Sequence, residues 1–214
     1  MPIEAELRLS GVVLERVRAA LAEHGGRRLR PPEHEQNQLW DRGGELASGQ
    51  RVLRVRRTWP SDATDATDTT DTTGGSGAPE QRCLLTYKDR PRSRDGVKSR
   101  REIELECDPD GAIEELLEAL GYEPSFRYVK LRESWTIDGH VVALDTTPLG
   151  SFVEIEGAAP RGLLARLGLE DAEVVASSYP ELWLEHRNAQ DAPADMVWPQ
   201  GHPRPSGSGQ AERP

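Results

Sequence analysis

Charged and apolar side chains alternate along several short stretches of this chain, beginning near its first residue. In the first stretch, Glu4, Glu6 and Arg8 alternate with apolar residues. A period of two places successive side chains on opposite faces of a β-strand. One such strand would simply expose its charged face to water. Because the pattern recurs in strand after strand, the sequence predicts a sheet with one charged face and one apolar face.

Turn and cap residues separate the predicted elements. Asp95-Gly96 and Asp138-Gly139 are typical of hairpin turns, and Gly25-Gly26 is typical of a helix end. Ser178 and Glu181 have the spacing of a capping box before a last helix. We therefore expect strands near residues 2–8, 36–42, 51–59, 83–88, 100–106, 126–136, 141–145 and 150–157, and helices near residues 13–21, 110–120, 160–167 and 178–187.

One face of the predicted strands collects eight carboxylates and seven bases. These are Glu4, Glu6, Arg8, Arg54, Arg56, Lys88, Arg100, Glu102, Glu104, Glu106, Lys130, Arg132, Asp145, Glu154 and Glu156. The opposite face is apolar, and four amphipathic helices are available to cover it. The charged face is then either the open outside of a sheet or the inside of a closed barrel, and eight antiparallel strands suffice to close one.

The free-energy cost of burying charge and the recurrence of the pattern decide between these two arrangements. Unpaired buried charges cost several kcal/mol each, which excludes a dry interior. A surface sheet with solvated, paired charges is the simpler explanation for any single strand. For all seven charged strands together we favour a water-filled tunnel. The predicted fold class is α+β: an eight-stranded antiparallel closed β-barrel with a charged interior and helices packed outside.

Composition limits the folded part of the chain. Residues 60–80 are rich in Asp, Thr and Gly without periodic apolar residues, so we expect a disordered loop inserted between two strands. Residues 188–214 are rich in Pro, Gly and Ser and are predicted to form a disordered tail, in which Met196-Val197-Trp198 is able to dock locally. Residues 1–187 remain as one domain.

Charge and hydropathy exclude several classes of function. The net charge of −10 argues against a nucleic-acid partner. No run approaches 18 apolar residues, so we expect neither a membrane span nor a signal peptide, and a cytoplasmic location. Cys83 and Cys107 have no metal-ligand spacing, and we expect reduced, buried thiols facing each other across a hairpin.

The motif Glu4-x-Glu6-x-Arg8 resembles the N-terminal Glu-x-Glu-x-Lys signature of the CYTH superfamily, the triphosphate tunnel metalloenzymes. Other segments resemble family motifs in the same order: Leu53-Arg54-Val55-Arg56, Leu85-Thr86-Tyr87-Lys88, Glu102-x-Glu104, Lys130-x-Arg132, Leu144-Asp145, Leu149-Gly150-Ser151-Phe152-Val153-Glu154-Ile155-Glu156 and Ser178-Tyr179. The resemblance covers about residues 2–187 apart from 60–80. Each motif has low specificity alone, but seven in the right order are specific. One departure is Arg8, which stands where the family has Lys and presents a planar guanidinium in place of an ammonium.

The resemblance implies a tunnel that binds triphosphate-containing substrates together with Mg²⁺ or Mn²⁺. By position, it implies metal binding by Glu4, Glu6, Asp145, Glu154 and Glu156, supported by Glu102 and Glu104. It implies triphosphate binding by Arg8, Arg54, Arg56, Lys88, Lys130 and Arg132, and catalytic roles for Glu4, Glu6 and Arg8. These residue types suit that chemistry, because carboxylates hold hard divalent cations and bases stabilise charge that develops on phosphate.

The predicted function is metal-dependent hydrolysis of a small-molecule triphosphate (inorganic, thiamine or nucleoside) by a monomer or homodimer. A class IV-type adenylate cyclase would use the same residues, with the ribose hydroxyl attacking in place of water. A third hypothesis is a non-catalytic polyphosphate-binding module, in which Arg8 marks the loss of turnover. Products distinguish the three: phosphate and a diphosphate, cyclic AMP and pyrophosphate, or binding without turnover.

Overall fold

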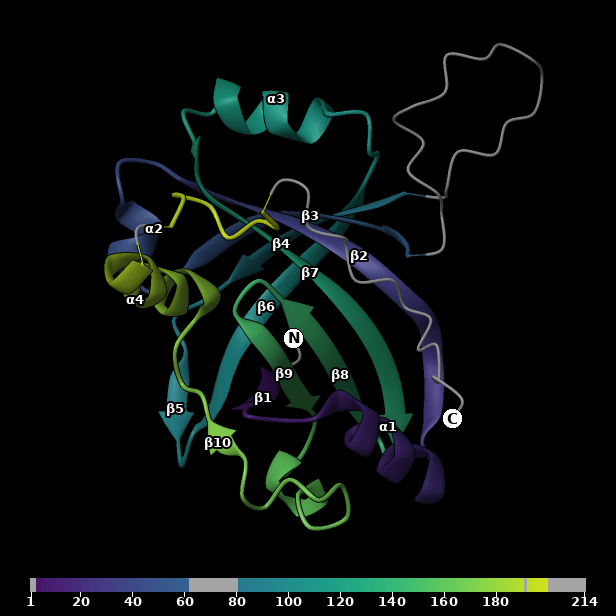
Figure 1. Ribbon diagram of the computed structural model, residues 1–214. Coiled ribbons are helices and arrows are strands. Elements are labelled where there is room, and N and C mark those ends of the chain that lie inside the picture. Colours follow the sequence, from purple (N-terminus) through teal and green to yellow (C-terminus); the bar gives the residue numbers. More distant parts are fainter. Residues whose placement is uncertain (1–2, 62–80, 191, 200–214) are drawn as a thin grey trace, which may run out of the picture.

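The computed structural model describes residues 3–61, 81–190 and 192–199, with Ile3, Glu4 and Gln190 described by their backbone alone. Its centre is a closed antiparallel β-barrel (Figure 1). Around the barrel the strands follow the order β1 (Ile3–Ser10), β9 (Gly150–Glu156), β8 (His140–Thr147), β7 (Glu123–Ile137), β2 (Arg27–Asp41), β3 (Val52–Pro60), β4 (Arg82–Lys88) and β6 (Val97–Cys107). β1 closes the barrel because it pairs with β9 and with β6. The predicted eight-stranded α+β barrel is confirmed.

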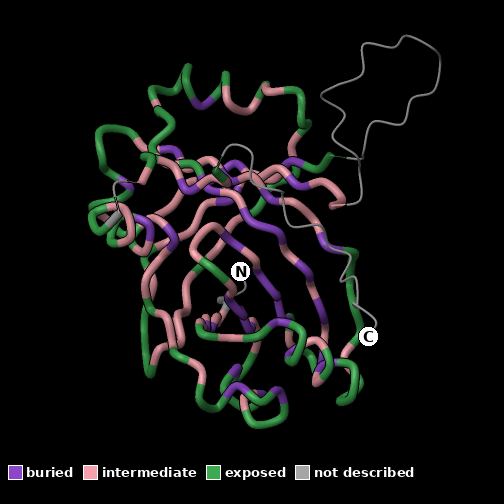
Figure 2. The backbone as a smooth tube through the Cα atoms, in the orientation of Figure 1, coloured by how far each residue is buried: buried purple, intermediate pink, exposed green. Residues whose placement is uncertain are grey.

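Helices cover the apolar outer face of the barrel. α1 (Leu14–Glu23) and the segment after β9 pack on β1, β8 and β9, and the buried residues there include Leu7, Val17 and Ile155. α3 (Ala112–Ala119) lies across β3 and β4 in Figure 1 and places Leu117 in a second cluster with Val55. Figure 2 shows buried residues recurring along the barrel strands. No helix in the described part of the chain is long and apolar enough to cross a membrane.

α4 (Tyr179–Gln190) belongs to a third cluster, at one end of the barrel. The cluster contains Tyr128, Phe152, Tyr179, Trp183 and Met196. Because Tyr128 and Phe152 belong to barrel strands, α4 is anchored to the barrel itself. The carboxylate half of the capping box predicted at its start is present, since the Glu181 carboxylate accepts hydrogen bonds from the backbone N–H and the hydroxyl of Ser178 at 2.6 and 2.7 Å.

Several predicted boundaries were wrong. β2 begins nine residues before the predicted strand at 36–42, and its pairing with β7 is irregular around Arg28, Arg30 and Glu33. Pro31 and Pro32 lie in this irregular stretch, where a strand tolerates residues that donate no backbone hydrogen bond. The segment predicted as a helix at 160–167 begins with a 3₁₀ turn, η1 (Pro160–Leu163), and three short elements were not predicted: α2 (Glu45–Ser48), β5 (Arg92–Arg94) and β10 (Glu173–Val174).

The predicted disordered regions fall partly outside the described residues. The loop predicted at 60–80 lies outside them except for its first two residues, since the structure describes nothing from 62 to 80. The tail predicted from residue 188 was wrong in its first part, because α4 continues to Gln190 and Met196 is fully buried. Met196 exchanges backbone hydrogen bonds with Arg127 and Val129, so the docking of this segment is confirmed. Cys83 and Cys107 are free thiols opposite each other on β4 and β6, as predicted, but only Cys83 is buried, whereas Cys107 is partly exposed.

Candidate functional site

The barrel interior forms a tunnel with two cavities that meet at a charged layer. One cavity, of about 230 Å³, extends to the start of α4, and the other, of about 640 Å³, extends toward Glu33 and Arg82. Arg56, Glu104 and Arg132 line both cavities. At this layer the Arg56 guanidinium lies 3.3 Å from the Glu104 carboxylate. The Arg56–Glu104 ion pair therefore lies between the two cavities.

The strand register brings acids opposite bases inside the tunnel. The directly opposed pairs are Arg8–Glu154, Glu35–Lys130, Lys88–Glu102 and Arg132–Asp145. Each is also an ion pair, with nitrogen–oxygen distances of 2.8, 3.5, 2.7 and 2.6 Å. Opposite charges facing each other across paired strands stabilise a sheet. This pairing is how the barrel accommodates many charges in a confined interior.

Asp145 is the most enclosed of these carboxylates. It is fully buried and accepts hydrogen bonds from Lys130 Nζ at 2.8 Å and from Arg132 Nε and Nη2 at 2.7 and 2.6 Å. The Tyr179 hydroxyl donates a fourth, at 3.2 Å. Three neighbouring side chains thus use both of its oxygens. In this structure Asp145 holds two phosphate-binding candidates in place, and its predicted role as a metal ligand remains a prediction.

Burial and the surrounding bases shift the pKa values of two tunnel carboxylates, Glu35 and Glu154. Burial raises the pKa of Glu35, but Lys130, Arg132 and Arg56 outweigh that effect and hold it below the ordinary range. The pKa of Glu154 is lowered in the same way by Lys130, Arg132 and Arg8. These carboxylates are therefore ionised when the tunnel is folded.

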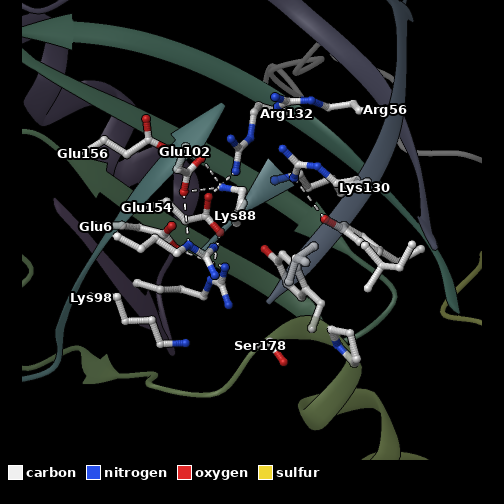
Figure 3. Close-up of a pocket in the computed structure, with 18 of the residues that line it drawn as sticks. Glu6, Arg56, Lys88, Lys98, Glu102, Lys130, Arg132, Glu154, Glu156 and Ser178 are labelled. Carbon is white, nitrogen blue, oxygen red and sulfur yellow. Dashed lines mark hydrogen bonds and ion pairs between the residues drawn. The ribbon is translucent and has the colours of Figure 1, made fainter. Parts of the chain in front are cut away.

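Cations outnumber acids around the α4-side cavity. Its described lining contains eight bases (Arg8, Arg54, Arg56, Lys88, Lys98, Arg100, Lys130 and Arg132) and five acids (Glu6, Glu102, Glu104, Glu154 and Glu156). Figure 3 shows the side chains of Lys88 and Arg132 close to Glu102 and Glu154, with Lys130 to one side of this group. Burial and the neighbouring Arg54 lower the pKa of Lys88, although Glu102 partly offsets them. Such crowding of positive charge favours a polyanionic ligand.

Among the predicted triphosphate ligands, Arg54 has the most distant carboxylate partner. Its Nη atoms donate to the Tyr128 hydroxyl and to Thr86, each at 3.3 Å, and the Glu104 carboxylate is 4.0 Å away. Its Nε is buried and has no hydrogen-bond partner among the described residues. Arg54 therefore keeps donor capacity and charge for a bound anion.

The acids suit a divalent cation at one place in the tunnel. Glu6 and Glu156 lie directly opposite each other on β1 and β9, and both line the cavity. Like charges directly opposite each other destabilise a sheet unless a cation lies near them. The Glu6 carboxylate contacts Arg8 at 3.1 Å. No group of three metal-ligating side chains is preassembled within the described ranges, which omit the Glu4 side chain. The oxygen donors of Glu6 and Glu156 fit Mg²⁺ or Mn²⁺ chemically.

The structure brings together most of the predicted site residues. Glu6, Arg8, Arg54, Arg56, Lys88, Glu102, Glu104, Lys130, Arg132, Glu154 and Glu156 line the α4-side cavity. Asp145 is buried beside that lining, bonded to Lys130 and Arg132. The side chain of Glu4 lies outside the described residues, and its backbone pairs with Arg100. The catalytic, metal-binding and substrate-binding roles assigned to these residues remain predictions.

Sequence reasoning missed three further tunnel residues. Glu35 was missed because its strand contains two prolines and no apolar alternation. Lys98 was missed because the predicted strand began two residues later, although it shares the face of Glu102. Tyr179 was identified only as part of a motif, and nothing in the local sequence indicated that its ring enters the tunnel wall. A scan for charge alternation without apolar residues would have found Glu35 and Lys98.

Comparison with known proteins agrees with this geometry. A family model described as the CYTH domain matches residues 29–164, more than half of the chain. None of the curated proteins matches the sequence. Among solved structures, PH1819 from Pyrococcus horikoshii OT3 is 24% identical, with a TM-score of 0.66 over 86% of this chain and 99% of that chain. A candidate adenylate cyclase from Vibrio parahaemolyticus is 16% identical, with a TM-score of 0.63 over 85% of this chain and 98% of that chain. HpAC1 from Hippeastrum, a proposed adenylyl cyclase for which a dominant triphosphatase activity is described, is 22% identical, with a TM-score of 0.61 over 87% of this chain and 96% of that chain. These structures share the fold of this chain, and the family match shows that the chain belongs to the CYTH domain family.

Proposed function

We propose that this protein hydrolyses a small-molecule triphosphate bound in the α4-side cavity of its tunnel. The observation that carries the proposal is the excess of bases over acids around that cavity, together with the unused donor capacity of Arg54. A triphosphate group supplies several negative charges along a short chain, which matches bases distributed over several strands. We also predict that the protein acts in the cytoplasm as a monomer or homodimer.

The bases on β3, β4 and β7 are our candidates for binding the triphosphate. Arg54 and Arg56 project from β3, Lys88 from β4, and Lys130 and Arg132 from β7, all into the tunnel. Charge-assisted hydrogen bonds to phosphate oxygens are short and strong. Because the carboxylate pairs fix these bases before the ligand arrives, they are positioned in advance for charge that develops on the leaving phosphate.

Carboxylates at the β1–β9 junction are our candidates for holding Mg²⁺ or Mn²⁺. Glu6 and Glu156 face each other there, and Glu4 continues the alternation of β1. A divalent ion at such a site polarises phosphate oxygens and lowers the pKa of a bound water. The role of the protein residues is to orient these carboxylates and to keep them ionised.

Hydrolysis and cyclisation require different space beside the same triphosphate site. The cavity of about 230 Å³ is smaller than the roughly 300–1,000 Å³ of sites that enclose a drug-sized ligand. Taken by itself, it matches the triphosphate group better than a nucleoside folded back for attack by its own ribose, and the Arg56–Glu104 ion pair lies between it and the larger cavity of about 640 Å³. The relatives support both activities in name, since one is described as an adenylate cyclase and another as having dominant triphosphatase activity. The cavity size leads us to favour hydrolysis.

The test is phosphate release from inorganic triphosphate, thiamine triphosphate and ATP with Mg²⁺ or Mn²⁺, comparing wild type with Glu6→Gln/Glu156→Gln. Glu15→Gln is a matched control, because Glu15 is an exposed residue of α1 outside the tunnel. We expect metal-dependent turnover that the double variant loses and the control retains. Formation of cyclic AMP without phosphate release, or triphosphate binding without turnover, would refute the proposal.

A further inference from the structure

The guanidinium of Arg8 contacts four protein groups. Its Nε donates to Glu154 at 2.8 Å and its Nη2 to Glu6 at 3.1 Å. Its Nη1 donates to the backbone carbonyl of Ser177 at 2.9 Å. The guanidinium carbon also lies 4.4 Å from the centre of the Tyr179 ring, which is a cation–π contact. The side chain is only 13% exposed, so these contacts occupy most of its surface.

The contacts with Ser177 and Tyr179 attach the start of α4 to the tunnel. The same segment is held further upstream, where the backbone N–H of Val175 donates to the Arg8 carbonyl at 2.9 Å. One residue of β1 therefore fixes the chain from Val175 to Tyr179 through both its backbone and its side chain.

The segment that Arg8 holds is part of the cavity wall. Ser178, Tyr179 and Pro180 line the α4-side cavity, together with Leu39 and Val52 from β2 and β3. Figure 3 shows Ser178 at the start of α4, below the charged side chains of the tunnel. The position of this segment therefore limits the size of the cavity at its α4 end.

We propose that Arg8 is a positioning residue, which holds the start of α4 as a wall and thereby makes the site select triphosphates that lack a bulky organic substituent. The selectivity rests on the proposed function, in that it assumes a triphosphate in this cavity. A lysine would keep the positive charge beside Glu6 and Glu154. It could not donate in the same plane to Ser177 and stack on Tyr179, because an ammonium is a compact point charge.

The experiment compares wild type with Arg8→Lys and Tyr179→Leu, measuring kcat and KM for inorganic triphosphate and for ATP. Hydrogen exchange of a peptide covering residues 175–182 reports the order of the wall without any ligand. Arg18→Lys is the matched control, because Arg18 also donates Nε and Nη2 to a buried carboxylate, Glu133, but lies outside the tunnel. Thermal unfolding verifies that each variant is folded.

In Arg8→Lys we expect the backbone amide hydrogens of residues 175–182 to exchange roughly tenfold faster than in wild type. We also expect KM to change more than kcat. The preference for inorganic triphosphate over ATP in kcat/KM should fall by about tenfold, the effect of about 1.4 kcal/mol of differential binding. Tyr179→Leu should shift the preference in the same direction, and Arg18→Lys should leave it unchanged.

Two results would overturn this role. Equal losses for both substrates in Arg8→Lys would make Arg8 a direct phosphate ligand, and an unchanged preference would remove the wall as a determinant of selectivity. If wild type hydrolyses no triphosphate, the proposed function fails, and hydrogen exchange still decides the positioning role. Unchanged exchange of residues 175–182 in Arg8→Lys would then refute it.

Discussion

Replacing Asp145 by Asn tests whether this carboxylate is the structural counter-ion of the tunnel bases. The fully buried Asp145 accepts hydrogen bonds from Lys130, Arg132 and Tyr179. Asparagine keeps one acceptor but loses the negative charge, and an amide N–H₂ in place of Oδ1 would face Nε of Arg132. Lys130 would retain Glu35 at 3.5 Å, and Arg132 would retain Glu154 and the more distant Glu35 at 3.9 Å.

Removing one partner of a buried ion pair costs about 3–5 kcal/mol. Because both bases keep a second carboxylate, we expect the lower end, a loss of about 3 kcal/mol in the free energy of unfolding. For a domain of this size that corresponds to a fall in Tm of about 6–12 °C. Urea denaturation in the presence of EDTA measures the loss without any contribution from bound metal.

Asp138→Asn is the control for this substitution. Asp138 is an exposed residue of the β7–β8 turn that pairs with Arg166. We expect Asp138→Asn to change the free energy of unfolding of the protein only slightly. A loss of less than about 1 kcal/mol in Asp145→Asn would show that the buried bases are satisfied without this carboxylate, which would refute the counter-ion argument. A normal stability combined with a changed metal requirement would instead favour the predicted role of Asp145 as a metal ligand.

Three further predictions address substrate binding, the outer face and pH. Arg54→Gln should weaken binding of inorganic triphosphate by about 10–100-fold in calorimetry, because a hydrogen bond to a charged group contributes about 1.5–3 kcal/mol; unchanged affinity would exclude Arg54 as a ligand. Glu133→Gln removes the carboxylate that pairs with Arg18 and Arg28 outside the tunnel. It should therefore lower the free energy of unfolding by about 1–2 kcal/mol and leave kcat unchanged. A fall in kcat would instead show that α1 is coupled to the site. Because the folded pKa of Glu35 is lowered, its stabilising contribution is present above the unfolded value of about 4.3 and is lost as the pH falls toward the folded pKa. Urea denaturation from pH 7 to pH 3 should therefore show a steep loss of stability below about pH 4, with a shallower slope in Glu35→Gln; equal slopes would contradict this account.

Much of the candidate site could be predicted because alternation is a local property. A side chain's face follows from its position along a strand, whatever that strand pairs with. For this reason Arg54 and Arg56, Lys130 and Arg132, and Glu154 and Glu156 could be assigned to the tunnel face from the sequence alone, and the structure places all six around one cavity. The first half of β2 gave no such signal, because its residues are polar on both faces and it contains two prolines.

The sequence by itself determined most of the barrel strands, their two faces and most of the enclosed charges, and it indicated a closed barrel; Glu35 and Lys98 were missed. Only the tertiary structure decided which acid meets which base: that Asp145 lies against Lys130 and Arg132, that Glu6 faces Glu156, and that Arg8 holds the start of α4. The physical reason is that cross-strand partners depend on the register and stagger with which the barrel closes, which combine distant parts of the chain. The period of two is set within each strand, whereas the pairing of charges is set by closure of the whole barrel.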